Sequence, residues 1–201
     1  SGGISKDEIV INLNWSQDNK EKEKGFFKRF FNNSSSDIDL DLGCFYELKD
    51  GQKSVIDGLQ FSNGRGGSKS KLSNQGRYTG KPWIWHSGDD RAGSVSDGEN
   101  IYLNPLGFAD IKRIMIYCFI YEGVSNWTQT NAVVTIKTPG NSAIVVKMGH
   151  QTSAEKFCVL ANLEFSGKDE VTIEKIVSFH MSHRKCDEAY NWGLTWTSGS
   201  K

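Results

Sequence analysis

The sequence lacks a net charge, because 24 lysines and arginines balance 24 aspartates and glutamates in 201 residues. A protein that binds nucleic acid through a broad basic surface carries an excess of basic residues, so the composition indicates no nucleic-acid partner. The chain also lacks an apolar run near the roughly 20 residues that a membrane-spanning helix needs. Its N-terminus is polar and has no apolar signal-peptide core.

Paired cysteines are missing too. Cys44, Cys118, Cys158 and Cys186 lie far apart, and no CxxC motif occurs. Three of them lie in the apolar runs LGCFY, IYCFIY and KFCVLA, which is typical of free cysteine packed as a small hydrophobic side chain. A disulfide framework or a zinc site would need paired spacings. We therefore predict four free, buried thiols in a reducing compartment, the cytoplasm.

The motifs of common enzyme classes are absent as well. No GxSxG, HExxH or P-loop occurs, and the histidines at 86, 150, 180 and 183 are scattered. His183 and Asp187 have i, i+4 spacing in a predicted helix, which favours a helical surface pair over catalysis. We expect a protein that is not an enzyme.

Strand-like runs fill most of the chain. The residues at 8–15 alternate between apolar and polar, and 111–123 form a nearly continuous apolar run, which predicts a central strand covered on both faces. Further predicted strands are 37–48, 54–61, 82–86, 100–105, 131–138, 143–148, 156–167 and 171–182.

One short helix is predicted at 182–193, with Ser182 as N-cap and Gly193 just past its end. Many strands with almost no helix predict an all-β fold, an antiparallel β-sandwich with one or two short helices. We expect a single domain over residues 1–201, with inserted loops at 16–36 and 62–81.

The stretch DIDLDL places Asp37, Asp39 and Asp41 at alternate positions. On a strand these side chains share one face, about 6.6–6.8 Å apart. In a cleft at an effective dielectric near 20, the two neighbouring pairs repel by about 5 kcal/mol in total. Either this face is open to water, where the cost is small, or a cation lies against it.

A second acidic cluster favours the cation. The glycine-bearing loop before the strand at 100–105 carries Asp89, Asp90, Asp97 and Glu99. Hard oxygen ligands on flexible loops, without histidine or cysteine, suit Ca²⁺. The spacing does not match an EF-hand, so we predict a calcium site built from a strand and a loop.

These motifs resemble a known family. The combination of INLNW, DIDLDLGCFYELKDG, GDDRAG, DGENIYLN, IYEG and HRKCDEAYNWGLTWTSGSK is similar to the TerD family of tellurium resistance and general stress proteins, and the ending resembles its TerA-type subgroup. The resemblance implies a β-sandwich that binds Ca²⁺ and acts with protein partners of a stress-resistance complex. Its metal positions match Asp37, Asp39, Asp41, Asp89, Asp90, Asp97 and Glu99. The family's loop is often richer in acidic residues and glycine at 94–96, where this chain has SVS, and this departure implies that one of two adjacent sites is weakened or lost.

Two alternative functions stay open. Phe26, Phe27, Phe30 and Phe31 lie beside basic residues, so a short amphipathic helix could contact a membrane surface as a peripheral adaptor; the same rings could instead pack onto the sandwich. The tryptophans, with a calcium ion, could form a lectin-like sugar platform, although packing in the core or at a sheet edge is their commoner role.

Overall fold

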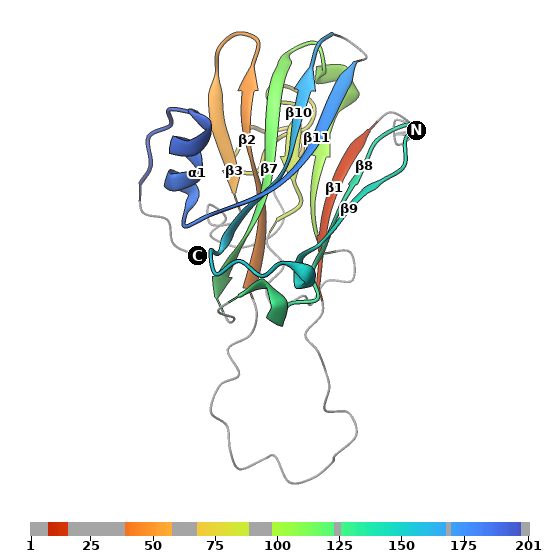
Figure 1. Cartoon of the computed structure of the whole chain (residues 1–201). Helices are drawn as coiled ribbons and strands as arrows, with labels where there is room; N and C mark the ends of the chain where they lie inside the picture. Colours follow the sequence, from red (N-terminus) through yellow and green to blue (C-terminus); the bar gives the residue numbers. More distant parts are fainter. Residues whose placement is uncertain are drawn as a thin grey trace.

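The computed structural model describes residues 8–15, 39–57, 68–88, 98–122, 126–167 and 170–197. In this part of the chain, two antiparallel sheets pack face to face and one α-helix lies against the outside of the second sheet (Figure 1). The predicted all-β sandwich is confirmed. The expected loop at 16–36 lies outside the described residues, as does the first part of the loop at 62–81.

The first sheet has six strands in the order β4-β5-β6-β1-β8-β9. Their bounds are β1 Ile9–Asn14, β4 Gly76–Arg77, β5 Ile84–His86, β6 Glu99–Leu103, β8 Val133–Lys137 and β9 Ile144–Lys147. Short 3₁₀ turns come after β6, β7 and β9, at Pro105–Gly107, Trp127–Gln129 and Met148–His150 respectively.

The second sheet has five strands in the order β11-β10-β7-β2-β3. Their bounds are β2 Asp39–Leu48, β3 Lys53–Asp57, β7 Ile111–Glu122, β10 Phe157–Phe165 and β11 Val171–His180. Strand β7 is the middle strand, as its apolar run predicts. One face of β7 packs in the core between the sheets, and the other packs in a second apolar cluster beneath the helix.

The four cysteines are free and buried, as predicted. Cys44, Cys118 and Cys158 lie in the core between the sheets, and Cys186 lies in the cluster under the helix. Burial raises the pKa of the Cys158 thiol to about 12. All four thiols therefore act as small hydrophobic side chains in the folded protein.

Helix α1 spans His183–Tyr190. The Ser182 hydroxyl accepts a hydrogen bond from the Lys185 backbone N–H, which confirms the predicted N-cap. The residue that ends the helix in the left-handed conformation is Asn191, with φ of 56°, and Gly193 follows two positions later.

The predicted surface pair of His183 with Asp187 is wrong. The Asp187 carboxylate accepts hydrogen bonds from the backbone N–H groups of Gly193 and Leu194 and from the Trp196 indole, while His183 bonds to Asp57 on β3. The helix lies on a sheet, so partners from other elements replace the neighbour one turn away.

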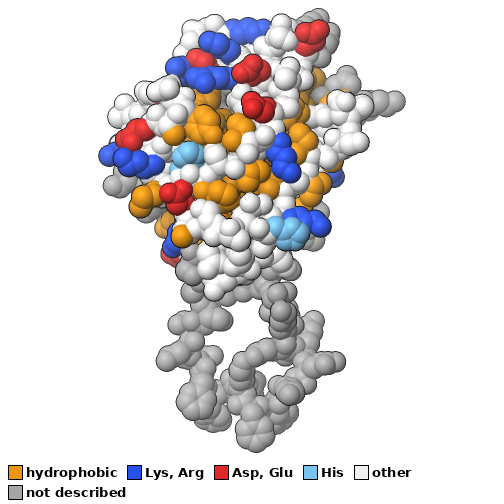
Figure 2. Space-filling model, viewed as in Figure 1, with side chains coloured by type: hydrophobic (Ala, Val, Ile, Leu, Met, Phe, Trp, Pro, Cys, Tyr) orange, Lys and Arg blue, Asp and Glu red, His pale blue; other side chains and the backbone are white. Residues whose placement is uncertain are grey.

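Strands β9 and β11 end the two sheets on the same side of the sandwich, and neither has a further strand beside it in the part of the chain that the structure describes (Figure 1). Hydrophobic side chains are visible across the middle of this face (Figure 2).

The pairing of β10 with β11 shifts register between Val159 and Ala161, so two β11 residues oppose one on β10. One of them, Val177, has φ of 57°, which is rare for a β-branched residue.

Among the described residues, no helix has both the length and the apolar character needed to cross a membrane.

Candidate functional site

The structure describes three of the seven predicted metal ligands. Asp39 and Asp41 lie on β2 and point to the same side of the strand, and Glu99 is the first residue of β6 in the opposite sheet. The other four, Asp37, Asp89, Asp90 and Asp97, lie outside the described residues. Of the predicted site, the structure therefore shows where Asp39 and Asp41 lie on β2 and where Glu99 lies at the end of the acidic loop.

These three side chains are buried. Their exposed fractions are 7% for Asp39 and 0% for both Asp41 and Glu99. Carboxylates at such burial are rare, because the charged form loses its hydration. The alternative in which the aspartate row faces open water is therefore wrong for Asp39 and Asp41.

Glu99 and His86 hold the backbone of Leu42 from the other sheet. The Leu42 N–H donates to Glu99 Oε2 at 2.9 Å, and His86 Nε2 lies 2.8 Å from the Leu42 carbonyl oxygen. Leu42 directly follows Asp41 in β2, so Glu99 binds the strand backbone one position beyond Asp41. We call this arrangement the Leu42 clasp.

The hydrogen bonds of His86 define its tautomer. Nδ1 accepts the Gly88 backbone N–H at 2.9 Å, so Nδ1 carries no proton and Nε2 is the N–H that donates to the Leu42 carbonyl. His86 Nε2 also lies 3.6 Å from Glu99 Oε2. In this arrangement the imidazole is neutral, so it supplies no positive charge to the neighbouring Glu99.

The chemistry of these donors fits a hard divalent cation. Carboxylate oxygens from Asp39, Asp41 and Glu99 are the ligand type that Ca²⁺ prefers. Within the described ranges alone, no three histidine, cysteine, aspartate or glutamate side chains are gathered closely enough to hold a metal ion. The described residues therefore do not by themselves make a metal site, and the sequence predicts that Asp37, Asp89, Asp90 and Asp97 supply further ligands.

A second polar cluster lies beneath helix α1, at residues that no sequence motif singles out. The Tyr117 hydroxyl donates to Asp57 Oδ2 at 2.5 Å, and His183 Nε2 bonds to the same oxygen. Asp57 is 3% exposed and ends β3, Tyr117 is on β7 and His183 begins α1. No local pattern predicts this cluster, because Asp57 and His183 are 126 residues apart.

Four aromatic rings surround the His183 imidazole in this cluster. The centroid distances are 4.6 Å to Phe119, 4.8 Å to Phe157, 5.2 Å to Tyr117 and 5.6 Å to Trp196. The packing and the bond to Asp57 fix the start of α1 on the sheet. These contacts give His183 a structural role, and the hydroxyl of the neighbouring Ser182 caps the helix.

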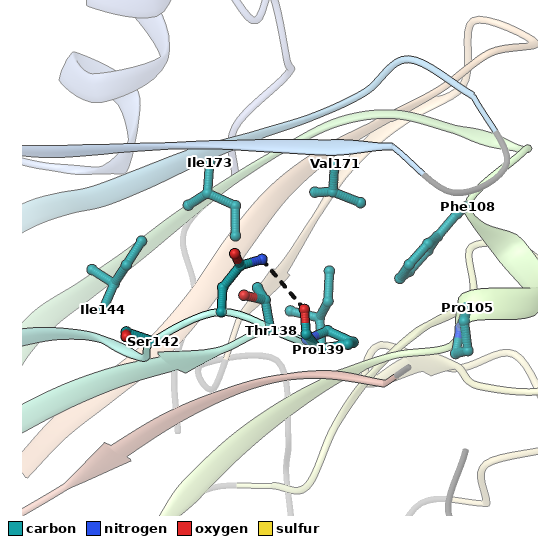
Figure 3. A pocket seen from close by; sticks show the side chains of 10 residues that line it. Pro105, Phe108, Thr138, Pro139, Ser142, Ile144, Val171 and Ile173 are labelled. Carbon is teal, nitrogen blue, oxygen red and sulfur yellow. Dashed lines mark hydrogen bonds between the residues drawn. The ribbon is translucent and has the colours of Figure 1, made fainter. Parts of the chain in front are cut away.

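A groove of about 600 Å³ opens between the sheets on the β9 and β11 side. In Figure 3, Val171 and Ile173 project from β11 toward Ile144 on β9 and Pro139 in the turn between β8 and β9. None of its lining residues, Ile9, Pro105, Phe108, Thr138, Pro139, Asn141, Ser142, Ile144, Val171 and Ile173, is charged. The described lining is therefore apolar apart from the neutral hydroxyl and amide groups of Thr138, Asn141 and Ser142.

The tryptophans considered for a sugar platform lie at separate places. Trp127 and Trp192 are 0% and 1% exposed, which confirms core packing for both. Trp83 donates to Asp110 at 2.8 Å, Trp196 donates to Asp187 at 2.8 Å, and Trp85 stacks on Tyr102. They do not form one common surface.

Comparisons with known proteins agree with this fold. The chain is 33% identical over 194 residues to tellurium resistance protein TerA from an Alcaligenes species, a match that covers 96% of this chain and 52% of that protein. The chain therefore spans about half the length of this curated relative. No protein-family model matches.

Solved structures show the same architecture. A homologue of telluride resistance protein TerD from Streptomyces coelicolor A3(2) superposes with a TM-score of 0.56 at 13% identity, over 88% of this chain and 91% of that one. A protein of unknown function gives the same TM-score at 12% identity, with the same coverage. At such low identity the likeness concerns the fold.

Proposed function

We propose that this chain, which belongs to the TerD family of tellurium resistance proteins and is of the TerA type, is a non-enzymatic calcium-binding module of a stress-resistance system. Ca²⁺ would bind the acidic strand and the loop that precedes β6, and would shape a surface for protein partners. The cytoplasm is the compartment that we propose for it. The observation that carries the proposal is the burial of three carboxylates: those of Asp39 and Asp41 on β2, and that of Glu99, which bonds to β2 at Leu42.

The electrostatic cost of this arrangement supports a cation. Two unit charges about 6.7 Å apart, as on alternate strand positions, repel by roughly 0.6 kcal/mol in water and by about 2.5 kcal/mol at an effective dielectric near 20. Asp39 and Asp41 are in this relation within a buried environment. A divalent ion near these carboxylates turns the repulsion into attraction.

The Leu42 clasp suggests how an ion would affect the rest of the fold. Glu99 bonds to β2 from the opposite sheet, and it is the residue at which the acidic loop enters β6. An ion shared by β2 and this loop would therefore tie the two sheets together at this point. We propose that this ordering is what a partner protein recognises.

Calorimetric titration with CaCl₂ tests the proposal. We expect heat of binding and a raised melting temperature for the native sequence, and loss of both in Asp39→Asn/Asp41→Asn. Asp50→Asn is the matched control, because Asp50 lies in the exposed turn between β2 and β3 and pairs with Lys81; it should bind as the native chain does.

The melting temperature of a single variant without calcium gives a second test. In chelator, Asp41→Asn should melt at or above the temperature of the native sequence, because it removes one charge from the repelling row. An unchanged melting temperature of the native chain in millimolar CaCl₂, with no heat of binding, would contradict the proposal.

A further inference from the structure

Three aromatic rings converge on one lysine on the outer face of the first sheet. The Lys69 Nζ lies 5.2 Å from the ring centroid of Tyr78, 5.1 Å from that of Trp85 and 5.2 Å from that of Tyr102. Each distance is within the roughly 6 Å over which an aromatic face attracts a cation. We call these three rings the aromatic cage.

The cage is built into the sheet. Trp85 on β5 and Tyr102 on β6 are directly opposite each other in register, and their rings stack at 5.9 Å. The residues on either side of them, such as Ile84 and Ile101, point into the core and are fully buried. The alternation of the strands thus forces both rings to the outer face.

Tyr78 is fixed at both ends. Its carbonyl accepts a hydrogen bond from the Asn104 side chain at 2.9 Å, and its hydroxyl donates to Glu8. Burial, together with the bond to Glu8 and the negative charge there, raises the pKa of Tyr78, so the phenol stays protonated. The cage therefore has a carboxylate bonded to one of its rings, which adds to the attraction for a cation.

The turn that contains Lys69 is held by backbone hydrogen bonds and not by the Lys69 side chain. The Lys69 carbonyl accepts the backbone N–H groups of Tyr78 at 2.8 Å and of Thr79 at 3.2 Å. Lys69 itself is exposed, so its ammonium group can leave the rings for water while these backbone bonds remain. A lysine ammonium is also strongly hydrated, which makes it a weak occupant of such a site.

We propose that the aromatic cage is a binding site for an organic ammonium cation bearing methyl groups, and that Lys69 occupies it as an internal competitor. A quaternary ammonium group gives up less hydration than a primary one and presents a larger surface to the three rings, so it displaces Lys69. This site is separate from the acidic residues of β2 and β6 and does not depend on calcium binding. The shared chemistry could be supplied by a free quaternary amine, a trimethylated lysine side chain or a choline headgroup.

Nuclear magnetic resonance of the full chain, with its lysines dimethylated by ¹³C-formaldehyde, tests occupancy. The Lys69 methyl signal, identified by its absence in Lys69→Ala, should be shifted upfield by the rings, whereas the signal of Lys71 on the same turn should not. Adding tetramethylammonium chloride should move the Lys69 signal toward the value for exposed lysine. Neopentyl alcohol, neutral and of similar shape, should leave it in place.

Affinity gives an independent measure. Lys69→Ala removes the competitor, so tetramethylammonium should bind about tenfold more tightly than to the native chain, given the strength of three cation–π contacts. Lys71→Ala should bind as the native chain does, and Tyr78→Phe, which keeps the ring, should retain most of the binding. Trp85→Phe keeps a weaker ring and should bind less tightly while remaining folded by its melting temperature.

Three probes then distinguish the possible sources of the ammonium group: choline, a peptide carrying trimethyllysine, and phosphatidylcholine vesicles. The one that binds most tightly to Lys69→Ala identifies the source. A Lys69 signal that stays ring-shifted at saturating tetramethylammonium, or equal affinities of the native chain and Lys69→Ala, would show the cage to be an internal anchor and overturn the proposal.

Discussion

Glu99 and Leu42, which are 57 positions apart in the sequence, are joined by a hydrogen bond of 2.9 Å between the Glu99 carboxylate and the Leu42 backbone N–H. The bond runs from one sheet of the sandwich to the other. It is a side chain to main chain contact, so it fixes the position of β2 without depending on the side chain of Leu42. Substitutions at Glu99 should therefore affect how the sheets are held together.

Replacing Glu99 by alanine should lower the free energy of unfolding by about 2–3 kcal/mol, because it leaves the buried Leu42 N–H without its acceptor. Glu99→Gln keeps an amide oxygen that can accept the same bond, so its loss should be about half as large. Urea unfolding in the presence of chelator measures both. Equal stability of Glu99→Ala and the native chain would show that the bond contributes nothing.

Replacing Gly43 by alanine should be strongly destabilising. A Cβ atom at this position would lie 2.5 Å from the Tyr117 ring, and Tyr117 is fully buried beneath α1, so it cannot move aside. Overpacking of this kind costs about 1–3 kcal/mol. Gly167→Ala is the control, since a Cβ there meets no atom within 4 Å. Melting temperatures should separate the two variants clearly.

The four thiols should react with a disulfide reagent only after unfolding. Burial raises the pKa of Cys186 to about 12, and the nearby negative charge of Asp187 adds to this; burial alone gives Cys158 a similar value. At pH 8 the thiolate fraction is then about one part in ten thousand. One fast-reacting thiol in the native protein would contradict this. The same burial argues against direct attack of these thiols on a tellurium oxyanion.

Glu47 should make stability depend on pH. Burial raises the pKa of Glu47, but the hydrogen bond and charge of Arg113, with the charges of Lys53 and Lys112, outweigh it and lower the pKa below its usual value. A lowered folded pKa means that the stabilisation is complete above about pH 4.5 and is lost as pH falls through the folded value.

Glu47→Gln should therefore be less stable than the native chain at pH 7, and the difference should shrink as the pH falls below about 4.5. Urea unfolding at a series of pH values measures this. Glu188→Gln is the comparison, because Glu188 forms an exposed pair with Lys185 on α1, which contributes little at any pH. A constant difference for Glu47→Gln from pH 7 to pH 3 would contradict the assignment.

Local features of the fold were predictable from the sequence. The period of two at 8–15 predicts β1, the apolar run at 111–123 predicts the central position of β7, and Ser182 predicts where α1 begins. Each of these depends on side chains that are neighbours along the chain or repeat with a fixed period. Such local signals do not depend on contacts with distant segments of the chain.

Contacts between distant segments were not predictable. The sequence pattern pairs His183 with Asp187, but the sheet under the helix offers Asp57 as a partner to His183. The Asp187 carboxylate is buried and bonds instead to the chain that follows the helix. Likewise, the acidic pattern of β2 predicts a charged face but not that the Leu42 backbone is held from the opposite sheet. The register between strands determines which residues meet in both contacts, and register is a property of the whole sandwich.

The bulge at Val177 has a consequence for how this protein behaves at high concentration. An outer strand with a regular backbone can act as a template on which another molecule adds a strand. The extra residue on β11 bends that strand and interrupts its row of outward amide and carbonyl groups. The bulge should therefore make β11 a poorer template for edge-to-edge aggregation.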